Sequence, residues 1–354
     1  MRYFKFAFLT CLATILLAVK VDAQQPAITT SSGVPGDFTA SARDRVNYYR
    51  AMAKLPPIVD DATISAGAMN HARYLVKNGI AGGDIVLDNG QLRFQTPQDA
   101  FRSEVEGRPF FTDDGASAGS NAAVVTARAI NLSGADFVDL MMTMPFRGLI
   151  PMVPQFSIAG LGAYCDPGEC AIVIPGRYAL EKSERIALYD GPASDQFWNP
   201  HLGLIPMETG RLRAPVEFPP DGATVNLQSF AGRDYPDPLS SCPGYKVPTG
   251  APISIQLGEG YGADGSLQVS SVSITRDGAE LDSCLITAAS YAGRTPEETQ
   301  TAKDILDRLG AAVILPREPL APGHYNVALK EDGKSYAWAF TVAAPAAPAQ
   351  SATR

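Results

Sequence analysis

The stretch at 115–119 reads Gly-Ala-Ser-Ala-Gly, the Gly-x-Ser-x-Gly pattern of serine hydrolases. That chemistry needs a buried strand before the serine and a helix after it, so that a strained turn exposes the hydroxyl. Here the polar Thr-Asp-Asp at 112–114 precedes the motif, and His and Asp partners could come only from distant segments. A short motif outside its context is weak evidence. Ser117 therefore stays an alternative nucleophile, and no catalytic residue is predicted.

Glu104, Asp113 and Asp114 are the carboxylates nearest to this motif. Two carboxylates can run acid–base catalysis when their surroundings separate their pKa values. Aspartates in a glycine-rich segment more often form turns and helix caps, and that role is expected for Asp113 and Asp114. A hydrolase built on a carboxylate pair around Glu104 remains the second enzymatic alternative.

The chain has three histidines, at 71, 201 and 324. His71 falls on the apolar stripe of an expected helix, so we predict a hydrogen-bonded residue at the edge of the core. His201 and His324 lie beside prolines or glycines in expected loops. None has partners at metal-ligand spacing, so neither a metal nor a cofactor is predicted.

Four cysteines fall outside the first 23 residues. Cys165 and Cys170 flank Asp-Pro-Gly-Glu, a hairpin-turn sequence, while Cys242 and Cys284 lie in a later, strand-rich region. An even number in an exported chain indicates disulfides. Three connectivities are possible, and pairing each cysteine with its neighbour along the chain is the simplest.

Export is predicted from residues 1–23, which have a basic start, an apolar run at 6–19 and a small-residue cleavage site before Gln24. The apolar run is too short to span a bilayer comfortably, and no other segment is apolar enough. We therefore expect a secreted or periplasmic protein with no membrane span. Without this segment the formal charge is −10. A net acidic chain argues against nucleic acid as a partner, because phosphate binding needs a basic surface.

Hydrophobic periodicity predicts four helices after a flexible spacer at 24–37. We expect them at about 38–53, 62–78, 121–129 and 135–144. Alternating or apolar runs at 156–164 and 170–175 predict a hairpin, and a strand near 185–189 is expected to complete the sheet. This mixture indicates an α+β sandwich over residues 38–190.

A proline-rich segment at 191–214 is expected to link this domain to a second one. The second segment, 215–342, alternates in short runs with turn signals between them, and Thr295 with Glu298 forms a helix capping box. These features predict an immunoglobulin-like β-sandwich with one inserted helix. Residues 343–354 form an Ala/Pro-rich tail that is expected to be disordered.

The first domain resembles the CAP superfamily (cysteine-rich secretory, antigen-5 and pathogenesis-related proteins). Its first helix carries the family's Asn-x-x-Arg pair, followed by a hinge similar to Gly-Leu-x-Pro-Leu with Lys54 in place of the glycine. The matching residues are Asn47, Arg50, Leu55, Pro57 and Ile58. Residues 141–148 align with Trp-Met-Asn-Ser-Pro-Gly-His-Arg, and 157–162 align with Thr-Glu-Ile-Gly-x-Gly. The resemblance implies an α-β-α sandwich.

The family's cleft gathers two histidines and two acidic residues, which hold a divalent metal in some members. The aligned residues in this chain are Arg102, Ser120, Arg147 and Ile158. A guanidinium stays protonated and repels cations, so it cannot replace an imidazole ligand. The resemblance therefore implies a degenerate cleft without metal.

Arg102 and Arg147, together with Glu104 and Ser120, form the ligand-binding prediction. If the two guanidiniums converge, they could bind a carboxylate, phosphate or sulfate. The alternative is that each arginine pairs with a nearby acid, such as Glu104 for Arg102. We expect an exported CAP-domain protein that binds a small anion or a cell-surface or protein partner. An extracytoplasmic hydrolase using Ser117 or acids near Glu104 is the alternative.

Overall fold

A computed structural model describes residues 35–80, 86–88, 91–93, 103–120, 122–127, 133–154, 156–166, 169–178, 189–190, 211–231, 234–258 and 267–344. The predicted signal segment and most of the predicted spacer, linker and tail lie outside these residues. The described ends of two of them are ordered elements: the first helix begins at Pro35, inside the predicted spacer, and a strand begins at Arg211, inside the predicted linker. The first region contains four α-helices within the described residues: α1 (Pro35–Met52), α2 (Ala62–Lys77), α3 (Asp113–Ser120) and α4 (Gly134–Met142). A 3₁₀ helix, η2 (Arg147–Met152), follows α4.

The strands of the first region form one sheet in the order β1-β5-β7-β4, with β6 also paired to β7. Their bounds are β1 (Val59–Asp60), β4 (Ala122–Ala127), β5 (Phe156–Ala159), β6 (Gly162–Asp166) and β7 (Glu169–Tyr178). Two short strands, β2 (Val86–Asp88) and β3 (Gln91–Arg93), pair with each other apart from this sheet.

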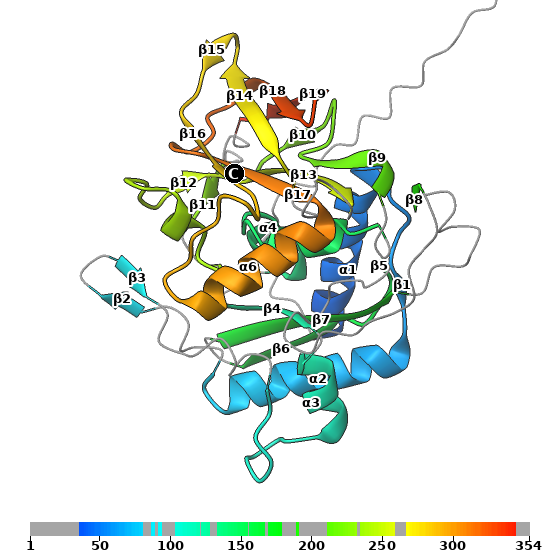
Figure 1. Cartoon of the computed structure of the whole chain (residues 1–354). Coiled ribbons are helices and arrows are strands. Elements are labelled where there is room, and N and C mark those ends of the chain that lie inside the picture. Colours follow the sequence, from blue (N-terminus) through cyan, green and yellow to red (C-terminus); the bar gives the residue numbers. More distant parts are fainter. Residues whose placement is uncertain are drawn as a thin grey trace, which may run out of the picture.

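The helices cover both faces of this sheet (Figure 1), α2 and α3 on one face and α1 and α4 on the other. Side chains alternate between the faces of a strand, and β7 shows the consequence. Its Ala171 and Val173 share a core cluster with α2, while Ile172 and Ile174 belong to the cluster that contains α1 and α4. The expected α-β-α sandwich is confirmed.

Two glycines of the 157–162 motif let this sheet approach α2 closely. A Cβ at Gly160 would lie 2.4 Å from the Ile64 carbonyl carbon, and one at Gly162 would lie 2.0 Å from that of Ala68. Such distances are far below van der Waals contact, so any larger residue would push the strand and helix apart. The Gly-x-Gly spacing is therefore a packing requirement of the first region.

One predicted helix is wrong. Residues 121–129 were expected to be helical, but 122–127 form strand β4, and the helix of this part of the chain is α3, immediately before it. The sequence Ala-Ala-Val-Val-Thr-Ala contains three consecutive β-branched residues, which favour a strand. All six residues pair with β7, from Ala122 opposite Pro175 to Ala127 opposite Cys170.

The second region consists chiefly of two five-stranded sheets, ordered β16-β17-β13-β9-β8 and β10-β19-β18-β14-β15. The first sheet contains β8 (Tyr189–Asp190), β9 (Arg211–Phe218), β13 (Ile253–Gly258), β16 (Ser283–Ile286) and β17 (Ala311–Pro316). The second contains β10 (Thr224–Val225), β14 (Val269–Arg276), β15 (Ala279–Glu280), β18 (Gly323–Glu331) and β19 (Lys334–Val342). The short strands β11 (Ser229–Phe230) and β12 (Thr249–Gly250) pair with each other. An all-β sheet region after the CAP-like sandwich agrees with the expected fold class.

The inserted helix was predicted correctly. Helix α6 (Pro296–Leu309) begins at Thr295, whose side chain accepts a hydrogen bond from the Glu298 backbone N–H, and it ends at Gly310 with φ 50°. The capping box is only half formed, because the Glu298 carboxylate accepts hydrogen bonds from the backbones of Asp237 and Arg294. Helix α6 packs against β13 and β17.

The strand expected near 185–189 does not complete the first sheet. Its described part, β8, pairs with β9 of the second region. The two regions also share one continuous apolar core, in which the rings of Tyr49 and Phe218 meet edge to face with centroids 5.6 Å apart. The Gln256 side chain adds a hydrogen bond to the Leu149 carbonyl across the junction. The first and second regions are therefore packed together directly.

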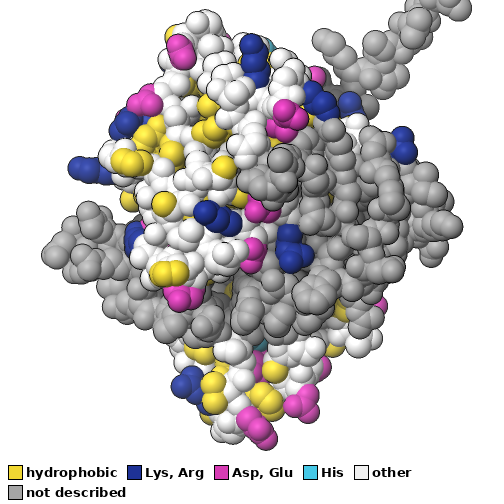
Figure 2. All heavy atoms as spheres, viewed as in Figure 1, with side chains coloured by type: hydrophobic (Ala, Val, Ile, Leu, Met, Phe, Trp, Pro, Cys, Tyr) yellow, Lys and Arg dark blue, Asp and Glu magenta, His cyan; other side chains and the backbone are white. Residues whose placement is uncertain are grey.

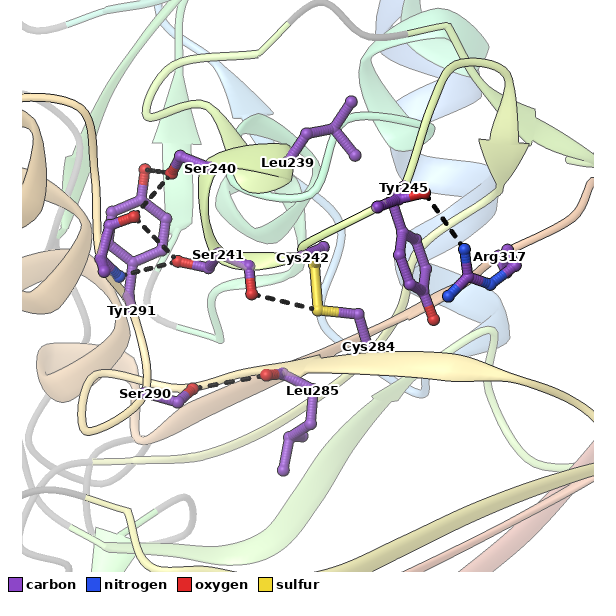
Figure 3. The surroundings of a disulfide bond; sticks show 12 residues. Leu239, Ser240, Ser241, Cys242, Tyr245, Cys284, Leu285, Ser290, Tyr291 and Arg317 are labelled. Atoms are coloured by element: carbon purple, nitrogen blue, oxygen red, sulfur yellow. Dashed lines mark hydrogen bonds between the residues drawn. A yellow bond between two sulfur atoms is a disulfide. The ribbon is translucent and has the colours of Figure 1, made fainter.

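Both predicted disulfides are present, Cys165–Cys170 across the β6–β7 hairpin and Cys242–Cys284 in the second region. Figure 3 shows the surroundings of the second bond, where the Cys284 sulfur lies 3.5 Å from the Ser241 carbonyl oxygen. Nearby, the Arg317 guanidinium stacks on the Tyr245 ring at 4.3 Å. Cys242 belongs to the loop after η3 (Pro238–Ser241), so the bond fastens this loop to β16.

No helix in the described part of the chain is long and apolar enough to cross a bilayer. Figure 2 shows one face of the molecule, on which Lys and Arg side chains alternate with Asp and Glu side chains. The described residues visible on that face form no continuous basic stripe.

Candidate functional site

The best-defined polar cluster of the first region is a buried pair between α2 and the segment that precedes α3. The His71 Nδ1 atom lies 3.0 Å from Glu104 Oε1, and both side chains are fully inaccessible to solvent. The other Glu104 oxygen accepts a 3.0 Å hydrogen bond from the Thr112 backbone N–H. The Tyr74 ring stacks parallel to the imidazole with a centroid distance of 6.3 Å. The prediction of a hydrogen-bonded core histidine is confirmed.

Helix α3 covers this pair with its two glycines. A Cβ at Gly119 would lie 2.2–2.5 Å from three atoms of the His71 ring, and one at Gly115 would lie 2.5 Å from Glu104 Oε1. These residues are four apart, so they share one face of the helix. Ser117 lies between them, roughly 200° around the axis, and is exposed. The Gly-x-Ser-x-Gly spacing here serves helix packing.

The aspartates of the 112–114 segment lie in the first turn of α3. Negative charge is favourable there because the first N–H groups of a helix point outward without intrahelical partners. The Asp114 carboxylate also accepts a 3.0 Å hydrogen bond from the Asn70 side chain. A hydrogen bond with the Thr112 side chain is the main cause that lowers the pKa of Asp114. The expected helix-terminal role of these aspartates is confirmed.

The structure does not bring together the described members of the predicted anion site. Glu104 lies on the α2–α3 face of the sheet, whereas Arg147 begins η2, which contacts α1, α4 and β5. Within the first region, sheet β4-β7-β5 separates the two layers (Figure 1). The sequence alignment placed both residues beside one cleft, but it contains no information about which sheet face each loop reaches. Arg102 and the side chains of Ser120 and Ile158 lie outside the described residues, so their place in a cleft stays a prediction.

Arg147 belongs instead to a polar cluster at the junction of the two regions. Asp234, which is completely buried, accepts hydrogen bonds from the backbone N–H groups of Phe146 at 2.5 Å and Arg147 at 3.3 Å. The Arg147 Nε atom lies 3.8 Å from the other carboxylate oxygen. Desolvation raises the pKa of Asp234 to about 6, against the opposing effect of Arg147. Sequence reasoning missed Asp234, because an aspartate near two prolines resembles an ordinary turn residue.

Asn47 and Arg50, the two polar residues of the first-helix signature, form hydrogen bonds with backbone groups of neighbouring segments. Asn47 bonds both ways with Ile58, accepting from its N–H at 2.8 Å and donating to its carbonyl at 3.4 Å. Arg50 is fully buried. Its guanidinium donates to the carbonyl oxygens of Pro56, Pro151, Val153 and Pro154. Burial lowers the pKa of Arg50 to about 10. This pair fixes the hinge after α1 and the end of η2, so its role is structural.

Within the described residues, no group of three or more His, Cys, Asp or Glu side chains is arranged to hold a metal ion. What the first region presents is a set of enclosed polar groups: a buried His–Glu pair, a buried arginine bonded to carbonyls and a buried aspartate at the junction. Each of these groups is bound to groups of the protein itself. These contacts stabilise the fold of the first region.

Comparison with known proteins matches part of the first region to a family. The sequence model of the CAP group, described as the cysteine-rich secretory protein family, matches residues 43–134. No curated protein matches the chain. Among solved structures, the chain aligns with PcoC, a methionine-rich copper resistance protein from Escherichia coli, and with its selenomethionine form. Both alignments have 17% identity and a TM-score of 0.19, covering 36% of this chain and 92% or 94% of PcoC. A TM-score this low carries no argument about fold or ligand.

Proposed function

Because the chain carries a domain of the cysteine-rich secretory protein (CAP) family, we propose that it acts as an exported binding protein rather than as an enzyme. A fold does not determine a function, so the proposal depends on the residues. The observation that carries it is the enclosure of His71 and Glu104, both of which are sealed from solvent and bonded to each other. A general acid or base must reach a proton on the substrate, and neither group can.

The serine alternative lacks the required geometry. A nucleophilic serine needs a base within about 3 Å of its hydroxyl. Ser117 occupies the exposed side of α3, whereas His71 lies under Gly119 on the opposite side. Ser117 also sits in the middle of a helix and not on a strand-to-helix turn. This arrangement supports binding over hydrolysis.

The surface that best supports a protein partner is the segment before α3. Phe110 is 39% exposed and Val105 is 52% exposed, two of the few large apolar side chains exposed in the described residues. Phe110 has φ 64°, an unfavourable conformation for a bulky residue, and the Arg73 guanidinium lies 4.4 Å from its ring centroid. Strain of this kind suggests a function, and exposed aromatic and arginine side chains are typical of binding hot spots. The second region would then act as an adhesion or spacer module.

Export is supported by the sequence at 1–23 and by the two disulfides, which persist in oxidising compartments. The test is N-terminal sequencing of the protein recovered from culture medium and from periplasmic and cytoplasmic fractions of its host. We expect a chain that begins at Gln24, outside the cytoplasm, with both disulfides oxidised. An intact chain confined to the cytoplasm with free thiols would contradict export.

The choice between binding and hydrolysis is tested with a fluorophosphonate probe on the purified mature protein. We expect no labelling, because Ser117 lies on the exposed side of α3, opposite the face that covers His71. Labelling that disappears in Ser117→Ala but persists in Ser335→Ala, an exposed serine on β19, would refute the proposal.

A photo-crosslinking residue at position 110, compared with one at exposed position 280, tests the partner surface in the exported protein. Adducts at 110 alone support it, while none or equal adducts would contradict it.

A further inference from the structure

A cavity of about 260 Å³ lies at the junction of the two regions, between the turn that ends α1 and strand β9. Its apolar walls are formed by Met52, Leu55, Pro154, Leu212, Val216 and Pro220. Its charged lining residues are Lys54, Arg213, Glu217 and Asp221. Ligand pockets typically measure about 300–1,000 Å³, so this one suits a molecule of amino-acid size.

Lys54 reaches this cavity from a strained backbone position. It follows α1 with φ 59°, in the left-handed region. That conformation costs a non-glycine residue about 1–2 kcal/mol, and helices usually place glycine there. The CAP resemblance also has glycine at this position, so the chain has a lysine where a smaller residue would be more stable. Strain retained at one lining residue suggests that its side chain has a function.

Glu217 lies on β9, in the wall provided by the second region, and is half buried. Burial and the nearby Asp221 carboxylate raise the pKa of Glu217 to about 7, while Lys54 and a hydrogen bond from the Asp221 backbone oppose the rise. Lys54 therefore attracts Glu217 electrostatically, yet within the described chain the two side chains form no ion pair within 4.0 Å. The Asp221 carboxylate already has a partner within the protein, since its Oδ1 accepts a 2.9 Å hydrogen bond from the Ala339 N–H.

We propose that this junction pocket binds a small zwitterion with an apolar side chain, such as an apolar α-amino acid, with its ammonium on Glu217 and its carboxylate on Lys54. The two protein charges come from different regions and line the same cavity. A ligand that carries both charges satisfies them together, through charge-assisted hydrogen bonds. The apolar walls then accept its side chain. An anion alone would leave Glu217 unpaired, and a cation alone would leave Lys54 unpaired.

The binding has a defined pH dependence. The ligand ammonium needs Glu217 ionised, and this carboxyl is about half protonated near pH 7 in the empty pocket. Asp221 and Lys54 act on Glu217, and Arg213 lines the same cavity. With a pKa of about 7, roughly nine-tenths of the carboxyl is ionised at pH 8 and one-tenth at pH 6. Affinity should therefore fall about tenfold from pH 8 to pH 6, and binding at pH 6 should release close to one proton.

The experiment is isothermal titration calorimetry of the full mature protein with L-leucine, 4-methylpentanoate and 3-methylbutylamine. The last two compounds lack the ammonium and the carboxylate, respectively. We expect leucine to bind, and each half-ligand to bind at least tenfold more weakly. Glu217→Gln and Lys54→Met should each weaken leucine binding about tenfold. Glu280→Gln, which removes an exposed acid on β15, should leave it unchanged.

Several results would overturn the inference. Absence of leucine binding would do so, as would half-ligands as tight as leucine or unchanged affinity in the two pocket variants. If a variant does not fold, the affinities of the three ligands for the unmodified protein still show whether the pocket recognises both charges of the zwitterion. The cavity lining shares no residue with the α2–α3 surface, so a negative result here leaves the proposed function standing.

Discussion

Replacing Gly119 by alanine tests directly whether helix α3 covers the buried His71. The added Cβ would lie 2.2 Å from Cε1, 2.4 Å from Nε2 and 2.5 Å from Nδ1 of the ring. Comfortable contact needs about 3.5–4.0 Å, so the ring or the helix must move by more than about 1 Å. The ring cannot move freely, because its Nδ1 bonds to Glu104 and its face stacks on Tyr74.

Overpacking in a core costs about 1–3 kcal/mol and sometimes more. Alanine regains about 0.5–1 kcal/mol over glycine inside a helix. The added Cβ overlaps three ring atoms by about 1 Å or more, which places the cost at the upper end of this range. The net expectation is therefore that Gly119→Ala lowers the free energy of unfolding by about 2 kcal/mol. In a His71→Ala background the clash disappears, so the same change should be neutral or should stabilise by up to about 1 kcal/mol. The interaction energy of the cycle is therefore about 2–3 kcal/mol.

Urea unfolding of the unmodified protein, both single variants and the double variant measures this energy. His71→Ala alone leaves a buried carboxylate unpaired and should cost about 3–5 kcal/mol, but that cost cancels in the cycle. Ser117→Ala, on the exposed side of the same helix, is the matched control and should change stability by less than about 1 kcal/mol. An additive cycle, or a Gly119→Ala variant as stable as the parent, would refute the packing explanation of the motif.

Three further expectations follow from other buried groups. Arg50→Met leaves four carbonyl bonds unmade and should cost about 3–5 kcal/mol in thermal unfolding; a loss below about 1 kcal/mol would contradict this role. Burial raises the Asp234 pKa from 3.8 to about 6, so the folded state binds this proton more tightly. That contribution is complete below pH 3.8 and is lost as pH rises through 6. The parent should therefore gain about 2 kcal/mol of stability relative to Asp234→Asn between pH 7 and pH 4; parallel stability–pH curves would contradict it. The disulfides close segments separated by 42 and 5 residues, so Cys242→Ser should cost about 4 kcal/mol and Cys165→Ser about 2 kcal/mol. Equal losses in urea unfolding would contradict that estimate.

Several parts of the fold could be predicted because their signals are local. The helix expected at 62–78 is α2, and the inserted helix expected at the Thr295 capping box is α6, which begins at that residue. The Cys165–Cys170 bond crosses a hairpin whose turn residues identified it. Each of these features depends on residues within one or two turns of chain, so a sequence window contains the relevant information.

The incorrect predictions concern features whose structure depends on contacts with segments far away in the sequence. The Val-Val-Thr run at 124–126 has only a weak, context-dependent preference for a strand, and pairing of the whole 122–127 segment with β7 decides the outcome. Likewise, the strand at 189–190 has no intrinsic preference for the first sheet over the second, and β9 determines its partner. Glu104 and Arg147 were grouped because their loops align with one family cleft, but the alignment does not specify the face of the sheet.

The sequence by itself determined that this protein has a CAP-like helical signature, a histidine on the apolar stripe of a helix, four cysteines able to form two disulfides and a strand-rich second half. Only the tertiary structure showed that His71 meets Glu104 from 33 residues away under Gly119. It also showed that Asp234 accepts a hydrogen bond from the backbone N–H of Phe146, 88 residues before it. The physical reason is the range of the interactions. Backbone propensity and side-chain period act over a few residues, whereas burial pairs any groups that packing brings together. The enclosed polar groups of the first region belong to this second category.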